Sequence, residues 1–309
     1  MGKLGVIDIG TNSVHLVVGE KRGGEVFIEL DTLAPTRLGE GLTKGKKLSP
    51  EAIKRTAEAV SHFFSLARSY GASRVIAVGT AALREVENAL EFIERVRASS
   101  HLDVSVISGE EEAYFTYKAI SSLSLIGDKY FLILDLGGGS SEFIFGDKGK
   151  IKEVVSLPIG CVKLTERFLS QFPLSPDDLR AARKEAMDIL SQLPEAEKPE
   201  VVIGVGGTAT CLAHLALGGR EYDPDKVEGY VLARGKVGEM IELLSSLPTE
   251  ERVRRFNLHP LRADIILGGA VILSAVMELF GKEEIVVSSR GLRHGVLIAE
   301  FEREGIDDR

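Results

Sequence analysis

Two aspartates, each followed by a short turn of small and polar residues, are the features of this sequence with the clearest chemical meaning. Residues 8–13 (DIGTNS) and 135–140 (DLGGGS) both read D-x-G-x-x-S, and they lie 127 positions apart. An aspartate at a strand end can hold Mg²⁺, directly or through water. Glycine lets the backbone approach a ligand closely, and successive N–H groups in such a turn bind an anion. The matched pair predicts phosphate binding, whereas either turn alone could be an ordinary β-hairpin. The expected phosphate contacts are Gly10, Thr11, Asn12, Ser13, Gly137, Gly138, Gly139, Ser140 and Ser141.

A second motif repeats in the same order. Gly79-Thr80-Ala81 and Gly207-Thr208-Ala209 each follow an apolar run and precede an amphipathic one, at an offset of 128. Two motifs in one order at nearly one offset predict two homologous halves. A helix N-terminus after glycines suits phosphate, so Gly207 and Thr208 join the expected phosphate set. The alternative is a tight turn with Thr208 as a helix cap.

Charged residues suggest the remaining chemistry. One of the acids 110–112 could polarise an attacking water, although acids also favour helix N-termini for electrostatic reasons alone. Arg84 could neutralise charge on a transferred phosphoryl group, or it could be a surface arginine. Further basic residues could guide a polyanion or simply be solvated. These are Arg37, Lys44, Lys46, Lys47, Lys163, Arg167, Arg290 and Arg293.

Short β-branched runs alternate with longer amphipathic runs, which indicates an α/β protein. Strands are expected at 4–9, 14–19, 26–33, 74–78, 104–107, 130–135, 142–146, 151–157, 201–205 and 284–288. Helices are expected at 51–70, 81–98, 110–123, 161–171, 177–193, 208–217, 236–245, 261–280 and 292–304. A small-polar stretch at 122–129 places the boundary between domains 1–124 and 125–309. Whether the last helix packs on the first domain stays open.

Composition excludes several classes of function. The net charge of −8 argues against a non-specific nucleic-acid binder. The two cysteines, Cys161 and Cys211, form no C-x-x-C pair, so a hard cation such as Mg²⁺ is favoured over zinc. No signal-peptide pattern is present, and the apolar stretch 265–277 is too short to span a bilayer. These features predict a cytoplasmic protein without nucleic-acid or membrane partners.

Taken together, the motifs resemble those of the Ppx/GppA phosphatases. The resemblance covers nearly the whole chain and rests on residues 7–13, 37–42, 79–85, 108–113, 134–142, 158–160, 204–209 and 289–295. It implies two duplicated actin-like (ribonuclease H-like) domains of the actin / sugar kinase / Hsp70 superfamily, with an interdomain cleft.

The resemblance also implies roles for individual residues. Glu112 matches the general base of the family, and Glu111 is the neighbour with which it could be confused. Asp135 and Glu142, with Asp8 as a further candidate, would organise Mg²⁺. Arg84 would be a phosphate or transition-state ligand. Thr11, Ser141 and His294 depart from the family pattern, and the first two keep a hydroxyl group.

The activity expected from the resemblance is Mg²⁺-assisted attack of water on the terminal phosphate of polyphosphate. One alternative is hydrolysis of guanosine pentaphosphate (pppGpp). Alternatives of another class are an acceptor-dependent phosphotransferase of the sugar- or acetate-kinase type and a non-catalytic nucleotide-binding module. A homodimer is compatible with the sequence, and the resemblance is to the compact two-domain form of the family, for which no C-terminal helical extension is expected.

Overall fold

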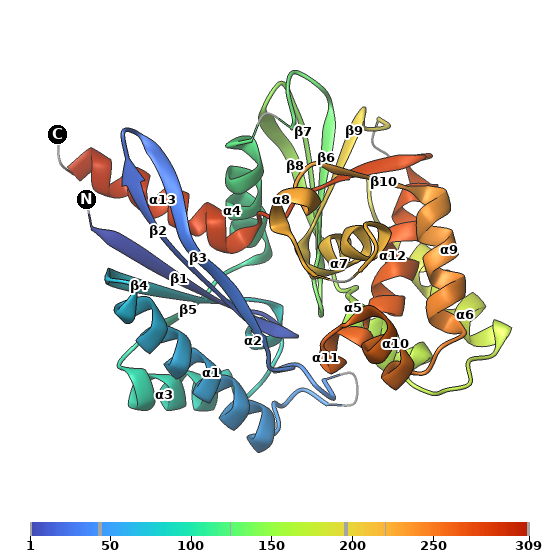
Figure 1. Cartoon of the computed structure of the whole chain (residues 1–309), viewed down its shortest axis with the longest axis horizontal. Coiled ribbons are helices and arrows are strands. Elements are labelled where there is room, and N and C mark those ends of the chain that lie inside the picture. Colours follow the sequence, from blue (N-terminus) through green and yellow to red (C-terminus); the bar gives the residue numbers. More distant parts are fainter. Residues whose placement is uncertain (1, 43–44, 124, 195–196, 220, 308–309) are drawn as a thin grey trace. The chain divides into compact units, whose positions relative to one another are not determined.

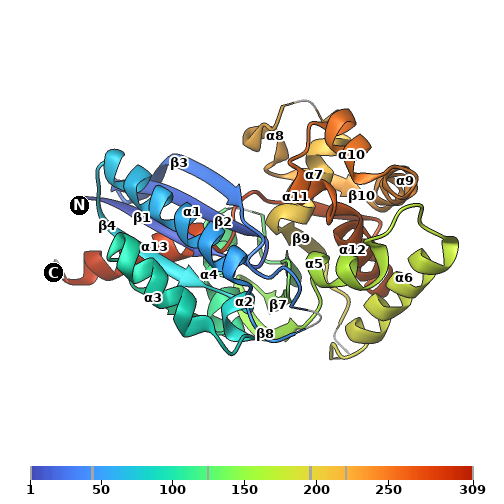
Figure 2. The same ribbon diagram turned by 90° about the horizontal axis from the view of Figure 1, so that it is seen from below.

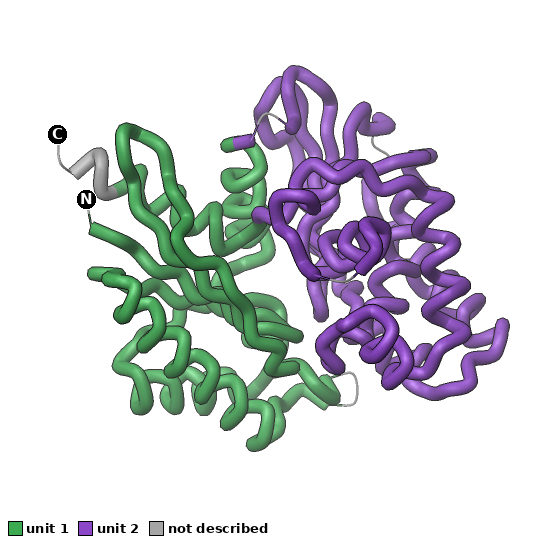
Figure 3. Tube along the Cα trace, in the orientation of Figure 1, with its two compact units in different colours: residues 1–122, 291–309 green, residues 123–290 purple. Residues whose placement is uncertain are grey.

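A computed structural model describes residues 2–42, 45–123, 125–194, 197–219 and 221–307, with side chains to Arg303 in the last helix. The chain forms two compact units (Figure 3). Unit 1 contains residues 1–122 and 291–309, and unit 2 contains residues 123–290. The sequence placed the division after residue 124 and left the last helix open. The structure divides the chain after Ser122 and joins α13 (Leu292–Asp307) to unit 1, where α13 packs against α4 (Gly109–Ser121) and β1 (Lys3–Ile9).

Unit 1 is built on a five-stranded mixed sheet of order β3-β2-β1-β4-β5 (Figure 1). The remaining strands are β2 (Ser13–Arg22), β3 (Glu25–Pro35), β4 (Ala72–Gly79) and β5 (Val104–Val106). The remaining helices are α1 (Pro50–Ser69), α2 (Ala81–Arg84) and α3 (Ala89–Ser100).

Helices cover both faces of this sheet (Figures 1 and 2). Strand alternation sends Ile7 and Ile9 into a core with α1 and α3, whereas Leu4 and Val6 pack with residues of α13. Asp8 therefore belongs to the face of β1 that is covered by α13, at the carboxyl end of the strand.

Unit 2 is built on a six-stranded sheet of order β10-β11-β9-β6-β7-β8. Its strands are β6 (Phe131–Leu136), β7 (Ser141–Asp147), β8 (Lys150–Leu157), β9 (Val201–Val205), β10 (Tyr230–Ala233) and β11 (Glu284–Val287). Its helices are α5 (Cys161–Leu164), the π-helix η1 (Thr165–Leu169), α6 (Pro176–Leu190), α7 (Gly206–Ala216), α8 (Pro224–Val227), α9 (Arg234–Ser245), α10 (Thr249–Phe256), α11 (Pro260–Ala263) and α12 (Ile266–Leu279).

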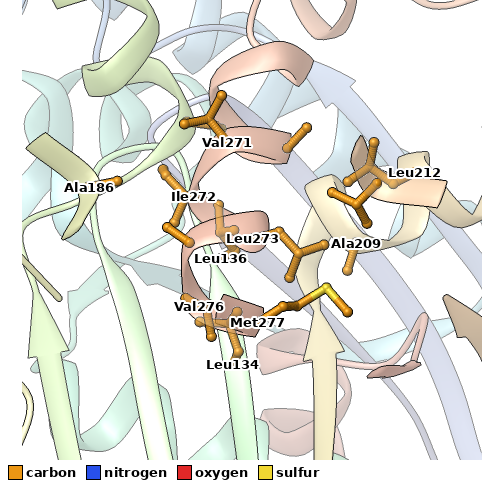
Figure 4. Close-up of a cluster of buried hydrophobic side chains, with 14 of the residues drawn as sticks. Leu134, Leu136, Ala186, Ala209, Leu212, Val271, Ile272, Leu273, Val276 and Met277 are labelled. Carbon is orange, nitrogen blue, oxygen red and sulfur yellow. The ribbon is translucent and has the colours of Figure 1, made fainter. Parts of the chain in front are cut away.

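The core of unit 2 surrounds α12, which packs against α5, α6, α7 and α9. Figure 4 shows Ile272, Val276 and Met277 of this helix beside Leu134 and Leu136 of β6. Among the described residues, the helical run Pro260–Leu279 has the length and the mean hydropathy, 1.6, to cross a membrane, and 72% of that window is buried in the protein, as in a core helix. The run exceeds the stretch 265–277 noted in the sequence because α11 adds a turn.

The two sheets confirm the predicted duplication and the α/β fold class. Strands β1, β2, β3, β4 and β5 have the same order and directions as β6, β7, β8, β9 and β11. Strand β10, an antiparallel addition at the edge of the second sheet, has no counterpart in the first. The sequence did not predict β10, α8 or α10.

Two expected helices are each divided in the structure. The run 81–98 becomes α2 and α3 because residues 87 and 88 bond to another loop. Glu87 N–H donates to the Lys46 carbonyl, and the Asn88 amide exchanges two hydrogen bonds with the Leu48 backbone. The run 261–280 becomes α11 and α12, and the carbonyl of Ala263, where α11 ends, accepts from the Arg252 side chain.

Candidate functional site

The two D-x-G-x-x-S segments form equivalent β-hairpins. Gly10 N–H donates to the Ser13 carbonyl at 2.9 Å, and Gly137 N–H donates to the Ser140 carbonyl at 3.1 Å. Each turn thus joins its strands in the same way, and each aspartate lies two residues before its turn. Thr11, Asn12, Ser13 and Ser140 are all buried.

The residue across from each aspartate differs between the hairpins. In unit 1, Asp8 pairs with His15 in the β1–β2 register. In unit 2, Asp135 pairs with Glu142 in the β6–β7 register. Directly opposed residues on antiparallel strands lie on the same face, and like charges there are destabilising unless something compensates them. Unit 2 therefore concentrates carboxylate charge where unit 1 does not.

Glu142 is held by hydroxyl groups. Its side chain is 1% exposed, and its Oε1 accepts hydrogen bonds of 2.9 Å from Ser140 Oγ and from Ser156 Oγ on β8. Neutral hydroxyl donors orient a carboxylate without cancelling its charge. Ser141 is instead structural, because it is fully buried and its Oγ donates to the Ile159 carbonyl.

Neighbouring segments fix the backbone of both turns. In unit 2, the N–H groups of Cys161 and Val162 donate to the carbonyls of Gly137 and Gly138, and a Cβ on Gly160 would overlap the Gly138 carbonyl. In unit 1, Gly39 N–H donates to the Thr11 carbonyl, and both Thr36 and Arg37 donate to Asn12. The turn carbonyls are thus bound by the protein in both units.

The strand register corrects the alignment of the second repeated motif. Asp8 pairs with Val78 and Asp135 pairs with Val205, so both motifs share the offset of 127. The counterpart of Gly79 is therefore Gly206, and Gly207 takes the place of Thr80. Gly206 has φ of +84°, and a Cβ there would lie 3.0 Å from Asp135 Oδ1, so a close approach to the carboxylate requires glycine.

The predicted residues of α7 take different positions. Gly207 lies in its first turn, where backbone N–H groups are available to an anion. The Thr208 side chain is 1% exposed and packs against Gly269 of α12. Only its backbone could serve the phosphate-binding role predicted from the sequence.

Arg262 is a residue of this region that the sequence reasoning missed. A Cβ on Gly207 would overlap its guanidinium, so the charge lies directly against the first turn of α7. Within the described part of the chain, the guanidinium forms no ion pair and donates no side-chain hydrogen bond. Arg262 follows Gly207 by more than fifty residues and belongs to a one-turn helix, so no local pattern could have indicated it.

In unit 1, the structure assigns different positions to the two candidate glutamates. Glu111 is exposed and completes a capping box with Ser108, because its carboxylate accepts from Ser108 N–H at 2.8 Å. Glu112 is 12% exposed, and its Oε2 accepts from Arg84 Nη1 at 2.7 Å. The same Arg84 nitrogen donates to the Ile107 carbonyl at 3.0 Å. Arg84 and Glu112, predicted separately, thus form a half-buried ion pair.

Helix α13 supports the helix that carries this pair. A Cβ on Gly295 would overlap the Phe115 carbonyl oxygen, so α13 crosses α4 at backbone contact. Lys118 of α4 also pairs with Glu302 of α13 at 2.6 Å. The position of Glu112 therefore depends on a helix from the other end of the sequence.

The start of α13 is held by a partly exposed charge cluster that includes Asp31 of β3. Arg293 donates two hydrogen bonds of 2.7 Å to Asp31, and His294 Nε2 lies 3.1 Å from Asp31 Oδ2. Burial acts to raise the pKa of Asp31, but Arg293 and His294 outweigh it and hold that pKa well below its usual range. His294, a departure from the family pattern, is thus a structural partner of Asp31.

Several of the other basic candidates form ion pairs, and both cysteines are buried. Arg293 pairs with Asp31, and Arg167 pairs with Glu185. Lys47 lies 3.9 Å from Glu87, and Lys44 lies outside the described residues. Burial raises the pKa of the Cys211 thiol to about 11 and also raises that of Cys161, as is typical of core cysteines.

The donor set fits a magnesium ion better than a transition metal. Among the described residues, no group of three or more histidine, cysteine, aspartate and glutamate side chains could enclose a metal. Mg²⁺ usually takes one or two carboxylates and completes its shell with water and substrate phosphates. The opposed pair Asp135 and Glu142 provides that number of ligands.

Comparison with known proteins agrees with this geometry. The sequence profile of the Ppx/GppA phosphatase family matches residues 17–304. Exopolyphosphatase 2 of Mycobacterium tuberculosis is 30% identical over 96% of this chain and 98% of its own length. A bifunctional 3-dehydroquinate synthase/phosphatase of Fusobacterium nucleatum is also 30% identical, and the match covers 98% of this chain but 46% of that relative. The crystal structure of the Aquifex aeolicus Ppx/GppA member superposes with a TM-score of 0.81 at 36% identity, covering 98% of both chains. The chain is therefore a hydrolase that belongs to the Ppx/GppA phosphatase family, as the sequence motifs predicted.

Proposed function

We propose that this chain removes the terminal phosphate of inorganic polyphosphate by attack of water, with Mg²⁺ as the cofactor. The observation that carries the proposal is the grouping at one edge of the second sheet. There Asp135 at the end of β6 opposes Glu142 at the start of β7, the glycine turn 137–139 joins these two strands, and Gly207 follows the neighbouring strand β9 with Arg262 against it. The relative named exopolyphosphatase 2 supports polyphosphate as the substrate.

In this proposal unit 2 binds the phosphate chain. Backbone N–H groups of the 137–140 turn and of the first turn of α7 donate to phosphate oxygens, and Arg262 offsets their charge. Asp135 and Glu142 would hold Mg²⁺, which when bound neutralises phosphate oxygens near the reacting phosphorus. Glycine is required at position 206 because a Cβ there would lie 3.0 Å from Asp135 Oδ1.

The proposed base is Glu112. Glu112 accepts a proton as a water oxygen forms a bond to the terminal phosphorus, and the bond from that phosphorus to the bridging oxygen breaks. The shortened chain leaves with the bridging oxygen and its negative charge. Arg84 orients the Glu112 carboxylate through the 2.7 Å contact. Glu111 is the weaker candidate because its carboxylate is committed to the capping box.

Phosphate release from polyphosphate, pppGpp and ATP, each with and without Mg²⁺, tests the proposal. We expect release from polyphosphate that depends on Mg²⁺ and needs no acceptor. Faster release from pppGpp would assign the nucleotide as the substrate of the same site. ATP turnover that requires an added acceptor would instead indicate a phosphotransferase and contradict the proposal.

A further inference from the structure

Arg252 of α10 is a buried arginine that the proposed mechanism does not use. It is 3% exposed, and within the described part of the chain its side-chain donations go to main-chain carbonyls. Nε is shared between the carbonyls of Leu244 at 2.9 Å and Leu247 at 3.0 Å, and Nη1 donates to the Ala263 carbonyl at 3.1 Å. Burying a charged group costs free energy unless hydrogen bonds compensate it, so the carbonyls that accept from Arg252 identify the segments that it holds.

The three carbonyls belong to two other elements. Leu244 and Leu247 lie in the last turn of α9 and just beyond it, where carbonyls lack the regular helical donor, although the Leu244 carbonyl also accepts from Leu247 N–H at 3.3 Å. Ala263 is the last residue of α11. One guanidinium therefore ties the end of α9 and the end of α11 to α10.

Helix α11 carries Arg262, the residue directly before Ala263. Four residues make a single turn, which is too short to hold its own conformation in water. The guanidinium of Arg262 nevertheless lies against Gly207 at the start of α7. The hydrogen bond from Arg252 to the Ala263 carbonyl is therefore one residue away from Arg262, whose side-chain direction determines its contact with Gly207.

We propose that Arg252 is a positioning residue, which holds α11 so that Arg262 faces the phosphate-binding turn of α7. The inference rests on the proposed function, in which Arg262 contacts the phosphate chain. Arg252 acts on substrate affinity and leaves the chemical step at Glu112 unchanged. Its planar fork reaches carbonyls of two elements at once, which a lysine would reproduce only in part.

A double-mutant cycle on the full chain tests this assignment. Arg252→Met and Arg262→Gln are each expected to raise KM for polyphosphate at least about tenfold and to leave kcat within about threefold. Because Arg252 acts through Arg262, the double variant should match Arg262→Gln alone. Arg252→Lys should fall between wild type and Arg252→Met, and it replaces Arg252→Met if that variant does not fold.

Leu190→Ala is the matched control for loss of stability. Leu190 is fully buried in the same core but lies on α6. It should lower Tm without raising KM. If Arg262→Gln leaves KM unchanged, the phosphate contact proposed for Arg262 is wrong and the role of Arg252 is wrong with it. If Arg262→Gln raises KM but Arg252→Met does not, or if their effects multiply, only the positioning role is overturned.

Discussion

The hairpin β1–β2 and the hairpin β6–β7 have the same backbone pattern, but the side chains opposite their aspartates differ. Asp8 faces His15 across the first hairpin, and Asp135 faces Glu142 across the second. Strand β9, which neighbours the second hairpin, is followed by Gly206, and Arg262 lies against the next residue, Gly207. Duplication thus preserved the hairpin, whereas of the two hairpins only β6–β7 places a second carboxylate opposite its aspartate.

The helices after the sheets differ in a complementary way. Unit 1 places Glu112 in the first turn of α4, where it pairs with Arg84 at the end of α2. In the proposed function, Asp135 and Glu142 would hold Mg²⁺, the 137–140 turn binds phosphate, and Glu112 accepts a proton from water. These roles can be tested by substitutions in one hairpin or one helix at a time.

Glu112→Gln should have the largest effect. Removing a base should lower kcat for phosphate release about 10²–10⁴-fold while Tm changes little, because glutamine keeps the shape and can still accept from Arg84. Glu111→Gln is the matched control, and its kcat should stay near wild type. If Glu111→Gln is inactive and Glu112→Gln is active, the base is Glu111 and the assignment to Glu112 is wrong.

Glu142→Gln should weaken the metal site of unit 2. We expect the Mg²⁺ concentration for half-maximal activity to rise about 10–100-fold, because a carboxylate charge is lost while the Ser140 and Ser156 bonds remain possible. The measurement is phosphate release over a Mg²⁺ titration. His15→Gln at the equivalent place in unit 1 should leave this concentration unchanged, and a shift there would remove the contrast between the hairpins.

Gly295→Ala tests the support of Glu112 by α13. A methyl group at Gly295 meets the Phe115 carbonyl, so we expect a loss of about 1–3 kcal/mol in unfolding free energy and a lower kcat. Thermal and urea unfolding measure the loss. Gly238→Ala on α9 is the control, because that helical glycine has open space around it, and alanine there should stabilise slightly. Equal effects of the two changes would show that α13 tolerates displacement from α4.

Asp31→Asn should have a smaller effect, on stability alone. The Asp31 side chain is 32% exposed, so solvent screening limits the loss to about 1–2 kcal/mol. Because the folded-state pKa is lowered, the stabilisation is complete above the unfolded pKa of about 3.9 and is lost as pH falls toward the folded value. Denaturant unfolding at several pH values should show the wild type converging on the variant in acid. A constant difference down to low pH would mean that Asp31 is not the titrating group.

The sequence predicted the local features of the fold well. The alternation of apolar residues located most strands and helices, and the repeated D-x-G-x-x-S turns predicted the duplication. The predicted helix bounds were wrong where side chains from distant segments form hydrogen bonds with the backbone. Asn88 bonding to Leu48 ended one helix, and Arg252 bonding to Ala263 ended another.

The residues of the candidate site also differ in whether local sequence could predict them. The turns, Asp8, Asp135 and the acids of α4 follow from short motifs. The roles of Glu142 and Glu112 came only from the family resemblance, because strand register and helix caps are not encoded in spacing alone. Arg262 could not be predicted, since its contact with Gly207 depends on how α11 packs.

Phosphate release from polyphosphate by Asp135→Asn and by Asp8→Asn, over one Mg²⁺ titration, compares the two hairpins most directly. The account predicts that Asp135→Asn requires at least about tenfold more Mg²⁺ than wild type, and that Asp8→Asn requires the wild-type amount. Equal shifts in both variants, or a shift confined to Asp8→Asn, would contradict the assignment of the metal to unit 2.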